Sequence, residues 1–119
     1  MYTFFYMEVL YDKSKICIVG KSNCPFCKKA LKLIKEKYGF QPVYIELNGM
    51  KNSRTYHDEL IAMTDQTTVP YIFIYGDFLG GYSELSEVHN YGVLKDVIDK
   101  KCVLICSCGE LFCSRCASN

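Results

Sequence analysis

Short apolar runs alternate with amphipathic segments along this chain, a pattern that predicts a sheet covered by helices. Residues 15–20 are expected to form a buried strand, and residues 25–38 carry an apolar stripe at helical spacing opposite a row of lysines. A second strand is expected over 43–47. A second helix is expected over 53–63, with Ser53 as its N-cap. The first half of the chain therefore predicts strand, helix, strand and helix in that order.

The second half of the chain predicts a hairpin followed by a helix. Residues 71–75 are rich in β-branched and aromatic side chains, which favour a strand. Gly76-Asp77 then predicts a tight turn into a short antiparallel strand that Gly80-Gly81 interrupts. From Ser83 onward the pattern is helical, in two pieces separated at 90–92. The whole order, with strands and helices alternating, is typical of an α/β fold.

Length and composition are those of one compact domain with a packed core. The chain has 119 residues, of which 50% are hydrophobic and 23% charged, and its formal net charge is +1. This balance gives no bias toward nucleic acid, and no apolar run approaches the length of a membrane span. Residues 1–11 lack the features of a signal peptide, so we expect them to belong to the fold. Periodicity leaves strand and helix open before residue 13, and we expect a monomer.

The cysteines of this chain fall into two groups. Five of the eight crowd residues 102–116, and the other three are Cys17, Cys24 and Cys27. A secreted disulfide scaffold would spread its cysteines and carry a signal peptide. We therefore expect a reducing compartment, the cytoplasm, with redox or metal chemistry at each group. Cys17, inside the first predicted strand, is expected to be a small buried hydrophobic residue.

Cys24-Pro25-Phe26-Cys27 carries the candidate chemistry. It opens the first predicted helix directly after a strand, which is a setting typical of thiol–disulfide exchange. Pro25 fits the first helical position, and Cys24 would be the N-cap, where the helix dipole favours a thiolate. The outer Cys24 would attack and the inner Cys27 would resolve. The alternative is half of a zinc site, which would need a second pair of ligands from the distant C-terminal cysteines.

At three landmarks the chain resembles the glutaredoxins, the glutathione-linked branch of the thioredoxin-like family. The landmarks are residues 21–27 (Lys-Ser-Asn-Cys-Pro-Phe-Cys), 68–70 (Thr-Val-Pro) and 80–85 (Gly-Gly-Tyr-Ser-Glu-Leu), in the family's order and spacing. The resemblance implies a thioredoxin-like three-layer α/β sandwich, with helices on both faces of a four-stranded mixed sheet. We assign residues 1–101 to a glutaredoxin domain and residues 102–119 to a cysteine-rich tail.

The same resemblance implies a glutathione-dependent oxidoreductase that reduces protein disulfides and glutathione mixed disulfides. Its catalytic pair would be Cys24 and Cys27, which form the redox-active disulfide. The residues implied to bind glutathione are Lys21, Phe26, Thr68, Val69, Pro70, Gly81, Tyr82 and Ser83. Pro70 would follow a cis peptide bond and place the Val69 backbone beside the ligand, as in strand addition. The helix that begins at Tyr82 and Ser83 would hold the γ-glutamyl carboxylate, and Lys21 the glycyl carboxylate.

The chain also departs from the family's pattern. Ser83 stands where many glutaredoxins have Asp, and Glu84 is a candidate to supply the missing negative charge. His57 stands roughly where Gln or Arg is frequent, and we expect it to be an exposed helix residue. Members that bind iron–sulfur clusters usually lack the second cysteine and have Gly after the first. Pro25 and Cys27 therefore favour electron exchange over cluster binding.

The C-terminal segment lies outside this resemblance. Residues 108–116 look like the second half of a RING-type zinc finger, with Glu110 where His is usual. One zinc site is possible, and its ligands would be Cys106, Cys108, Cys113 and Cys116. The other hypotheses for these cysteines are internal disulfides, regulatory oxidation and a disordered tail without a role. The alternative function is therefore a metal-binding module, for zinc or an iron–sulfur cluster, or an interaction module that uses this tail.

Overall fold

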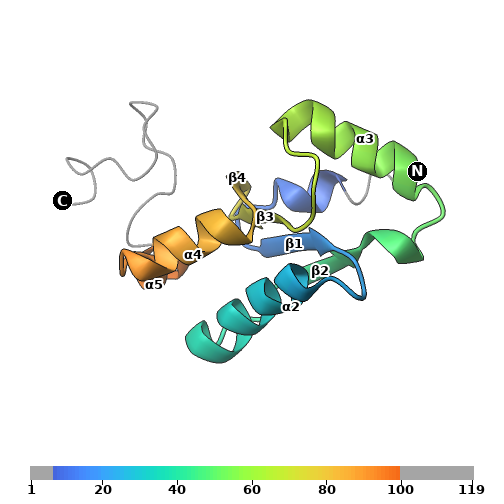
Figure 1. Cartoon of the computed structure of the whole chain (residues 1–119). Helices are drawn as coiled ribbons and strands as arrows, with labels where there is room; N and C mark the ends of the chain where they lie inside the picture. Colours follow the sequence, from blue (N-terminus) through green and yellow to red (C-terminus); the bar gives the residue numbers. More distant parts are fainter. Residues whose placement is uncertain (1–6, 100–119) are drawn as a thin grey trace.

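A four-stranded mixed sheet forms the centre of the computed structural model, which describes residues 7–99 (Figure 1). The strands follow the order β2-β1-β3-β4 across the sheet. Their bounds are β1 (Ile16–Gly20), β2 (Val43–Glu46), β3 (Tyr71–Ile74) and β4 (Asp77–Gly80). β1 runs parallel to β2 and antiparallel to β3, and β3 runs antiparallel to β4. The parallel pair is joined by a helical crossover, because parallel strands cannot be linked by a tight turn.

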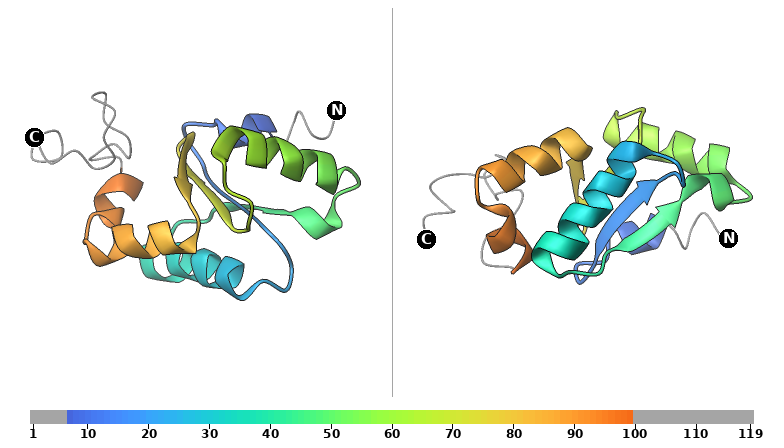
Figure 2. Two further views of the ribbon diagram at one scale, coloured as in Figure 1. Left: turned by 45° about the horizontal axis from the view of Figure 1, so that its top comes forward. Right: turned by 60° about the horizontal axis from the view of Figure 1, so that its bottom comes forward.

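Helices cover both faces of this sheet, as Figures 1 and 2 show. The helices are α2 (Pro25–Lys32), α3 (Ser53–Thr64), α4 (Tyr82–Asn90) and α5 (Leu94–Ile98). A π-helical turn, η1 (Leu33–Lys37), continues α2, and a 3-10 turn, η2 (Leu47–Gly49), follows β2. α3 covers one face, while α2, α4 and α5 cover the other. The predicted three-layer α/β fold is thus confirmed.

Successive side chains of β1 point to opposite faces of the sheet, and the buried core accordingly forms two clusters, one on each face. Ile16 and Ile18 pack with Ala30 of α2 on one face of the sheet. Cys17 and Val19 point to the other face, where a second buried cluster forms. The burial predicted for Cys17 is confirmed, since the residue is 1% exposed and its thiol donates to the Val9 carbonyl at 3.3 Å.

Three local predictions need correction. The hairpin turn is Tyr75-Gly76 and not Gly76-Asp77, because the two-residue turn needs positive φ at both positions, and φ is 51° and 91° there. Ser53 is the first residue of α3, and the N-cap is Asn52. The choice between strand and helix before residue 13 is settled only for the described residues, where residues 7–10 are helical and Leu10 is fully buried.

None of the helices within residues 7–99 is long and apolar enough to cross a membrane. The division at residue 101 and the tail beyond it fall outside the described residues and stay predictions.

Candidate active site

The two thiols lie at the N-terminal end of α2, at the edge of the sheet where β1 ends. Cys24 is the N-cap with an extended backbone, and its sulfur accepts a hydrogen bond from the Cys27 N–H at 3.3 Å. Pro25 takes the first helical position, where a missing N–H costs nothing. The first turn holds no acidic side chain. The free N–H groups and the helix dipole therefore act on Cys24 without a competing carboxylate.

The two thiols differ in their access to solvent. Cys24 is half-buried, whereas the Cys27 side chain is fully buried. Burial raises the pKa of Cys27 to about 11, and the neighbouring Cys24 raises it further, while a hydrogen bond from the Lys21 backbone acts in the opposite direction. This arrangement suits Cys24 as the thiol that meets a substrate and Cys27 as the one that acts after it.

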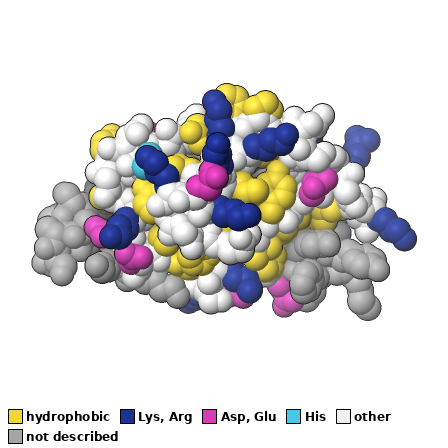
Figure 3. All heavy atoms as spheres, turned by 90° about the horizontal axis from the view of Figure 1, so that it is seen from below, with side chains coloured by type: hydrophobic (Ala, Val, Ile, Leu, Met, Phe, Trp, Pro, Cys, Tyr) yellow, Lys and Arg dark blue, Asp and Glu magenta, His cyan; other side chains and the backbone are white. Residues whose placement is uncertain are grey.

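A row of lysines lies on the helical segment that begins at the dithiol. They stand on the exposed face of α2 and η1 and are Lys28, Lys29, Lys32, Lys35 and Lys37. Figure 3 shows the molecule from below, where several basic side chains, in blue, lie beside exposed apolar surface, in yellow. The Nζ atom of Lys29 lies 5.3 Å from the centre of the Phe26 ring. The exposed face of this helical segment is therefore basic, which favours anionic ligands.

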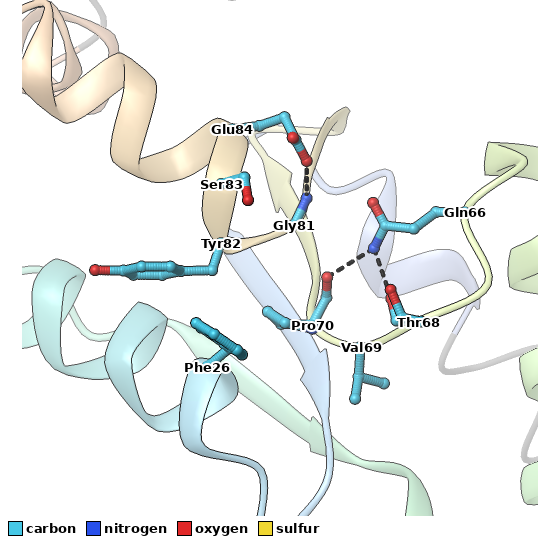
Figure 4. Close-up of a pocket in the computed structure, with 9 residues that line it drawn as sticks. All are labelled: Phe26, Gln66, Thr68, Val69, Pro70, Gly81, Tyr82, Ser83 and Glu84. Carbon is cyan, nitrogen blue, oxygen red and sulfur yellow. Dashed lines mark hydrogen bonds between the residues drawn. The ribbon is translucent and has the colours of Figure 1, made fainter.

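A pocket of about 220 Å³ opens beside the start of α2 (Figure 4). Its walls come from three segments that are distant in sequence: the first turn of α2, the loop before β3 and the start of α4. The lining residues are Phe26, Gln66, Thr68, Val69, Pro70, Gly81, Tyr82, Ser83 and Glu84. Seven of the eight residues that the sequence implied for glutathione are therefore brought together around one cavity.

The exception is Lys21, which is exposed and lies outside the pocket's lining. It sits in the turn between β1 and Cys24, and its carbonyl accepts a hydrogen bond from the Tyr44 hydroxyl at 2.8 Å. Thr68 and Ser83 are exposed at the rim, whereas Pro70 is buried. The roles of all eight residues toward a ligand stay predictions.

The loop before β3 is held in place by Gln66, as Figure 4 shows. Its amide donates to the Thr68 carbonyl at 2.7 Å and to the Pro70 carbonyl at 2.8 Å. The Val69–Pro70 peptide bond is cis, as the resemblance implied. These contacts fix the backbone on either side of Val69, so its N–H and C=O groups are held at the edge of the pocket.

Tyr71 and His57 link this loop to the core through further hydrogen bonds. The Tyr71 hydroxyl donates to the Gln66 carbonyl at 2.6 Å and lies 3.0 Å from Nε2 of His57. Since that hydroxyl already donates, His57 donates to it from Nε2. The expectation of an exposed His57 was wrong, because the ring is half-buried against Tyr71.

The N-terminus of α4 forms the opposite wall of the pocket. Gly81 is its N-cap, and Oε1 of Glu84 accepts from the Gly81 N–H at 2.6 Å. Glu84 thus engages the backbone of its own helix, which is the capping contact of a third helical residue. Phe26 reaches across from α2 to Tyr82, with the ring centres 5.8 Å apart. The aromatic contact joins the dithiol's helix to this wall.

Replacing Glu84 with Ala should lower the free energy of unfolding by about 1 kcal/mol, because the Gly81 N–H loses its intramolecular partner. Chemical denaturation of both proteins measures this difference. Glu87→Ala is the matched control, since Glu87 is exposed on the same helix and should change stability by less than about 0.5 kcal/mol. Equal stability of the Glu84→Ala protein and the parent would show that the contact does not support the helix.

Three further residues at this site could not be recognised in the sequence. Asn48 donates to the Ser22 hydroxyl at 2.7 Å and accepts from the Ser22 N–H at 3.1 Å, which holds the turn before Cys24. In the sequence Asn48 is only a strand-ending residue. Gln66 and Tyr44 likewise carry no local signal. The partners of Gln66 are carbonyls of its own irregular loop, and the partner of Tyr44 is the Lys21 carbonyl, which only the fold brings near.

The possible zinc ligands, Cys106, Cys108, Cys113 and Cys116, lie outside the described residues. Within residues 7–99, the structure has no group of three or more His, Cys, Asp or Glu side chains arranged to hold a metal ion. The dithiol therefore has no further ligand in this part of the chain.

Comparison with known proteins gives a consistent result. Residues 9–79 match the glutaredoxin family model. Glutaredoxin-1 of Rhizophagus irregularis is 36% identical over 92 residues, which cover 77% of this chain and 90% of that protein. Monothiol glutaredoxin-7 of Saccharomyces cerevisiae is 31% identical over 93 residues, 76% of this chain, and the match spans 46% of that longer protein. The crystal structure of a buckwheat glutaredoxin–glutathione complex superposes with a TM-score of 0.76 at 26% identity, covering 82% of this chain and 88% of that one.

Proposed function

Because the chain belongs to the glutaredoxin family, whose members are thiol–disulfide oxidoreductases, we propose that it takes its electrons from glutathione. The observation that carries this proposal is the pocket at the first turn of α2, the helix that Cys24 caps, which joins the Val69 backbone to the N-terminus of α4. A backbone edge can pair with a peptide, and a helix N-terminus can hold a carboxylate. Glutathione offers both groups together with its thiol. The complex formed by the related buckwheat protein supports the same ligand.

Reduction of a glutathione mixed disulfide needs only Cys24. Its thiolate attacks the glutathione sulfur, the substrate's disulfide bond breaks, and the substrate leaves as a thiolate that takes up a proton. Glutathione is then bound to Cys24 through a new disulfide. The thiolate of a second glutathione attacks the sulfur of the bound one, so oxidised glutathione leaves and the Cys24 thiolate is restored.

Reduction of a protein disulfide uses both cysteines. Cys24 attacks one sulfur of the substrate disulfide and forms a mixed disulfide with it, and the other substrate sulfur leaves as a thiolate. The Cys27 thiolate then attacks the Cys24 sulfur, which releases the substrate sulfur bound to Cys24 as a second thiolate and leaves a Cys24–Cys27 disulfide. Two glutathione molecules, oxidised to glutathione disulfide, return this pair to the dithiol.

The walls of the pocket and both thiols come from one chain, so a single copy suffices and we propose a monomeric enzyme. We also propose a cytoplasmic location, since a glutathione-reduced dithiol needs a reducing compartment. Family membership favours this oxidoreductase over the metal-binding or interaction module that the tail suggested.

The proposal is tested by a coupled assay on the full chain, with a glutathionylated peptide as substrate and the consumption of NADPH as the readout. Turnover is expected with glutathione and glutathione reductase. A parallel reaction with thioredoxin and thioredoxin reductase, without glutathione, should give no turnover above the enzyme-free rate. Turnover in that second reaction alone would contradict glutathione dependence.

A further inference from the structure

The burial of Cys27 disfavours the thiolate form that its proposed role requires. It must lose its proton before it can attack the mixed disulfide on Cys24, because the thiolate is the nucleophile. Its side chain is fully buried, and burial raises the pKa of the thiol to about 11. At neutral pH only a small fraction of Cys27 is therefore ionised, and any group that donates to its sulfur will increase that fraction.

The Tyr44 hydroxyl is such a group. Tyr44 lies on β2 opposite Ile18 of β1, and its ring packs on the face of the sheet that α2 covers. The hydroxyl donates to the Lys21 carbonyl at 2.8 Å and lies close enough to the Cys27 side chain to lower the pKa of its thiol. A hydroxyl carries one hydrogen, so it can serve only one of these two acceptors at a time.

Gly20 makes this contact possible. It is the last residue of β1 and shares the side of the strand from which Ile16 and Ile18 face α2. A Cβ atom at Gly20 would lie 2.6 Å from the Tyr44 hydroxyl and 2.8 Å from the Cys27 sulfur. Both atoms therefore lie beside the one position in the strand that has no side chain.

Few other charged or titratable groups act on this pair. Cys24 faces Cys27 from the N-cap of α2, and Lys21 contributes a backbone hydrogen bond from the turn. On β2, Glu46 acts on Tyr44 alone. Burial and the nearby thiols and carboxylate all raise the pKa of Tyr44, so its hydroxyl keeps its proton and stays a donor.

We propose that Tyr44 is a positioning residue for the resolving thiol, and that its hydroxyl turns from the Lys21 carbonyl to the Cys27 sulfur when the thiolate forms. The inference rests on the dithiol branch of the proposed function. The Cys27 thiolate bonds to the Cys24 sulfur, and the bond from Cys24 to the substrate breaks. The departing substrate thiolate takes up, through solvent, the proton that Cys27 gave up. Tyr44 itself gains and loses no proton.

The ionisation of Cys27 can be measured without any turnover. In the Cys24→Ser background, the ¹³Cβ chemical shift of Cys27 is followed against pH by NMR, which needs no access to the buried thiol and separates it from the other cysteines. Adding Tyr44→Phe should move this profile up by about half to one pH unit, because one donor to the thiolate is lost. An unchanged profile would overturn the proposal, whichever reductant the protein uses.

The resolving step is measured in a single turnover of the reduced full chain with a small aliphatic disulfide, quenched by acid and followed by intact mass. Tyr44→Phe should slow the conversion of the Cys24 mixed disulfide into the Cys24–Cys27 disulfide by about three- to tenfold. It should leave formation of the mixed disulfide unchanged.

Tyr38→Phe is the matched control, because it removes a ring hydroxyl that bonds to His89 at the far end of the same helical segment. This variant should change neither step. Equal slowing of both steps by Tyr44→Phe would overturn the proposal, since a hydroxyl that only supports the fold would affect both cysteines alike. Failure of the glutathione assay would leave both measurements interpretable, because neither uses glutathione.

Discussion

The Cys24→Ser variant is expected to lose thiol–disulfide exchange by a factor on the order of a thousand or more, because a serine hydroxyl is a far weaker nucleophile at neutral pH. Cys24 is the partly exposed N-cap of the helix whose first turn borders the pocket, and its sulfur is the atom on which each proposed step depends. The buried Cys27 cannot take over its task, since it is fully shielded from a substrate. The glutathione-coupled assay measures the loss directly.

The Cys27→Ser variant should behave differently. It should keep the reduction of a glutathionylated peptide and lose the reduction of a protein disulfide, because only the second reaction needs an internal resolving thiol. The two substrates assayed side by side give this separation. Cys17→Ser is a useful control, because Cys17 is buried on the opposite face of the sheet and should leave both reactions unchanged. Turnover that survives in Cys24→Ser would contradict the mechanism.

Replacing Gly20 with Ala should lower the free energy of unfolding by about 1–3 kcal/mol and impair the resolving step. The new Cβ would lie 2.6 Å from the Tyr44 hydroxyl and 2.8 Å from the Cys27 sulfur, both below ordinary contact distance. Cys27 is held at that position by the first turn of α2, so the clash must displace the thiol, the ring or the helix.

Gly49→Ala is the matched control for this clash. Gly49 has no atom within 4 Å of an added Cβ, so the same substitution should change stability by less than about 0.5 kcal/mol there. Chemical denaturation of both variants provides the comparison, and the single-turnover measurement reports the effect of Gly20→Ala on disulfide formation. A Gly20→Ala protein as stable as the Gly49→Ala protein would show that the space over Gly20 is not filled as described.

Much of the fold could be predicted because its signals are local. The strand at Ile16–Gly20 and the helix that begins at Pro25 follow from alternation, helical spacing and a proline at the first helical position. The hairpin turn was misplaced by one residue, since Gly76 is its second residue and Tyr75 adopts the positive φ that a side chain rarely takes.

The segments that form the site could be predicted from the sequence, but the side chains that hold these segments in place could not. Three short segments carried the resemblance, and the sheet order brings two of them, around Val69 and Gly81, to the start of α2. The supporting contacts of Gln66, His57 and Tyr44 cannot be recognised in the sequence. His57 and Tyr44 bond to residues that are distant along the chain, and Gln66 bonds to a carbonyl that the loop conformation brings within reach. A lone helix histidine is usually exposed, and here tertiary packing overrides that expectation.

The most direct test of the central claim is to ask where glutathione becomes attached. The Cys27→Ser variant of the full chain is treated with a small excess of glutathione disulfide, digested without reduction and mapped by mass spectrometry. The proposed mechanism predicts one glutathione per chain, on the peptide that carries Cys24, because the mixed disulfide cannot be resolved internally. A Cys24 that stays free while other cysteines carry the adduct would contradict it.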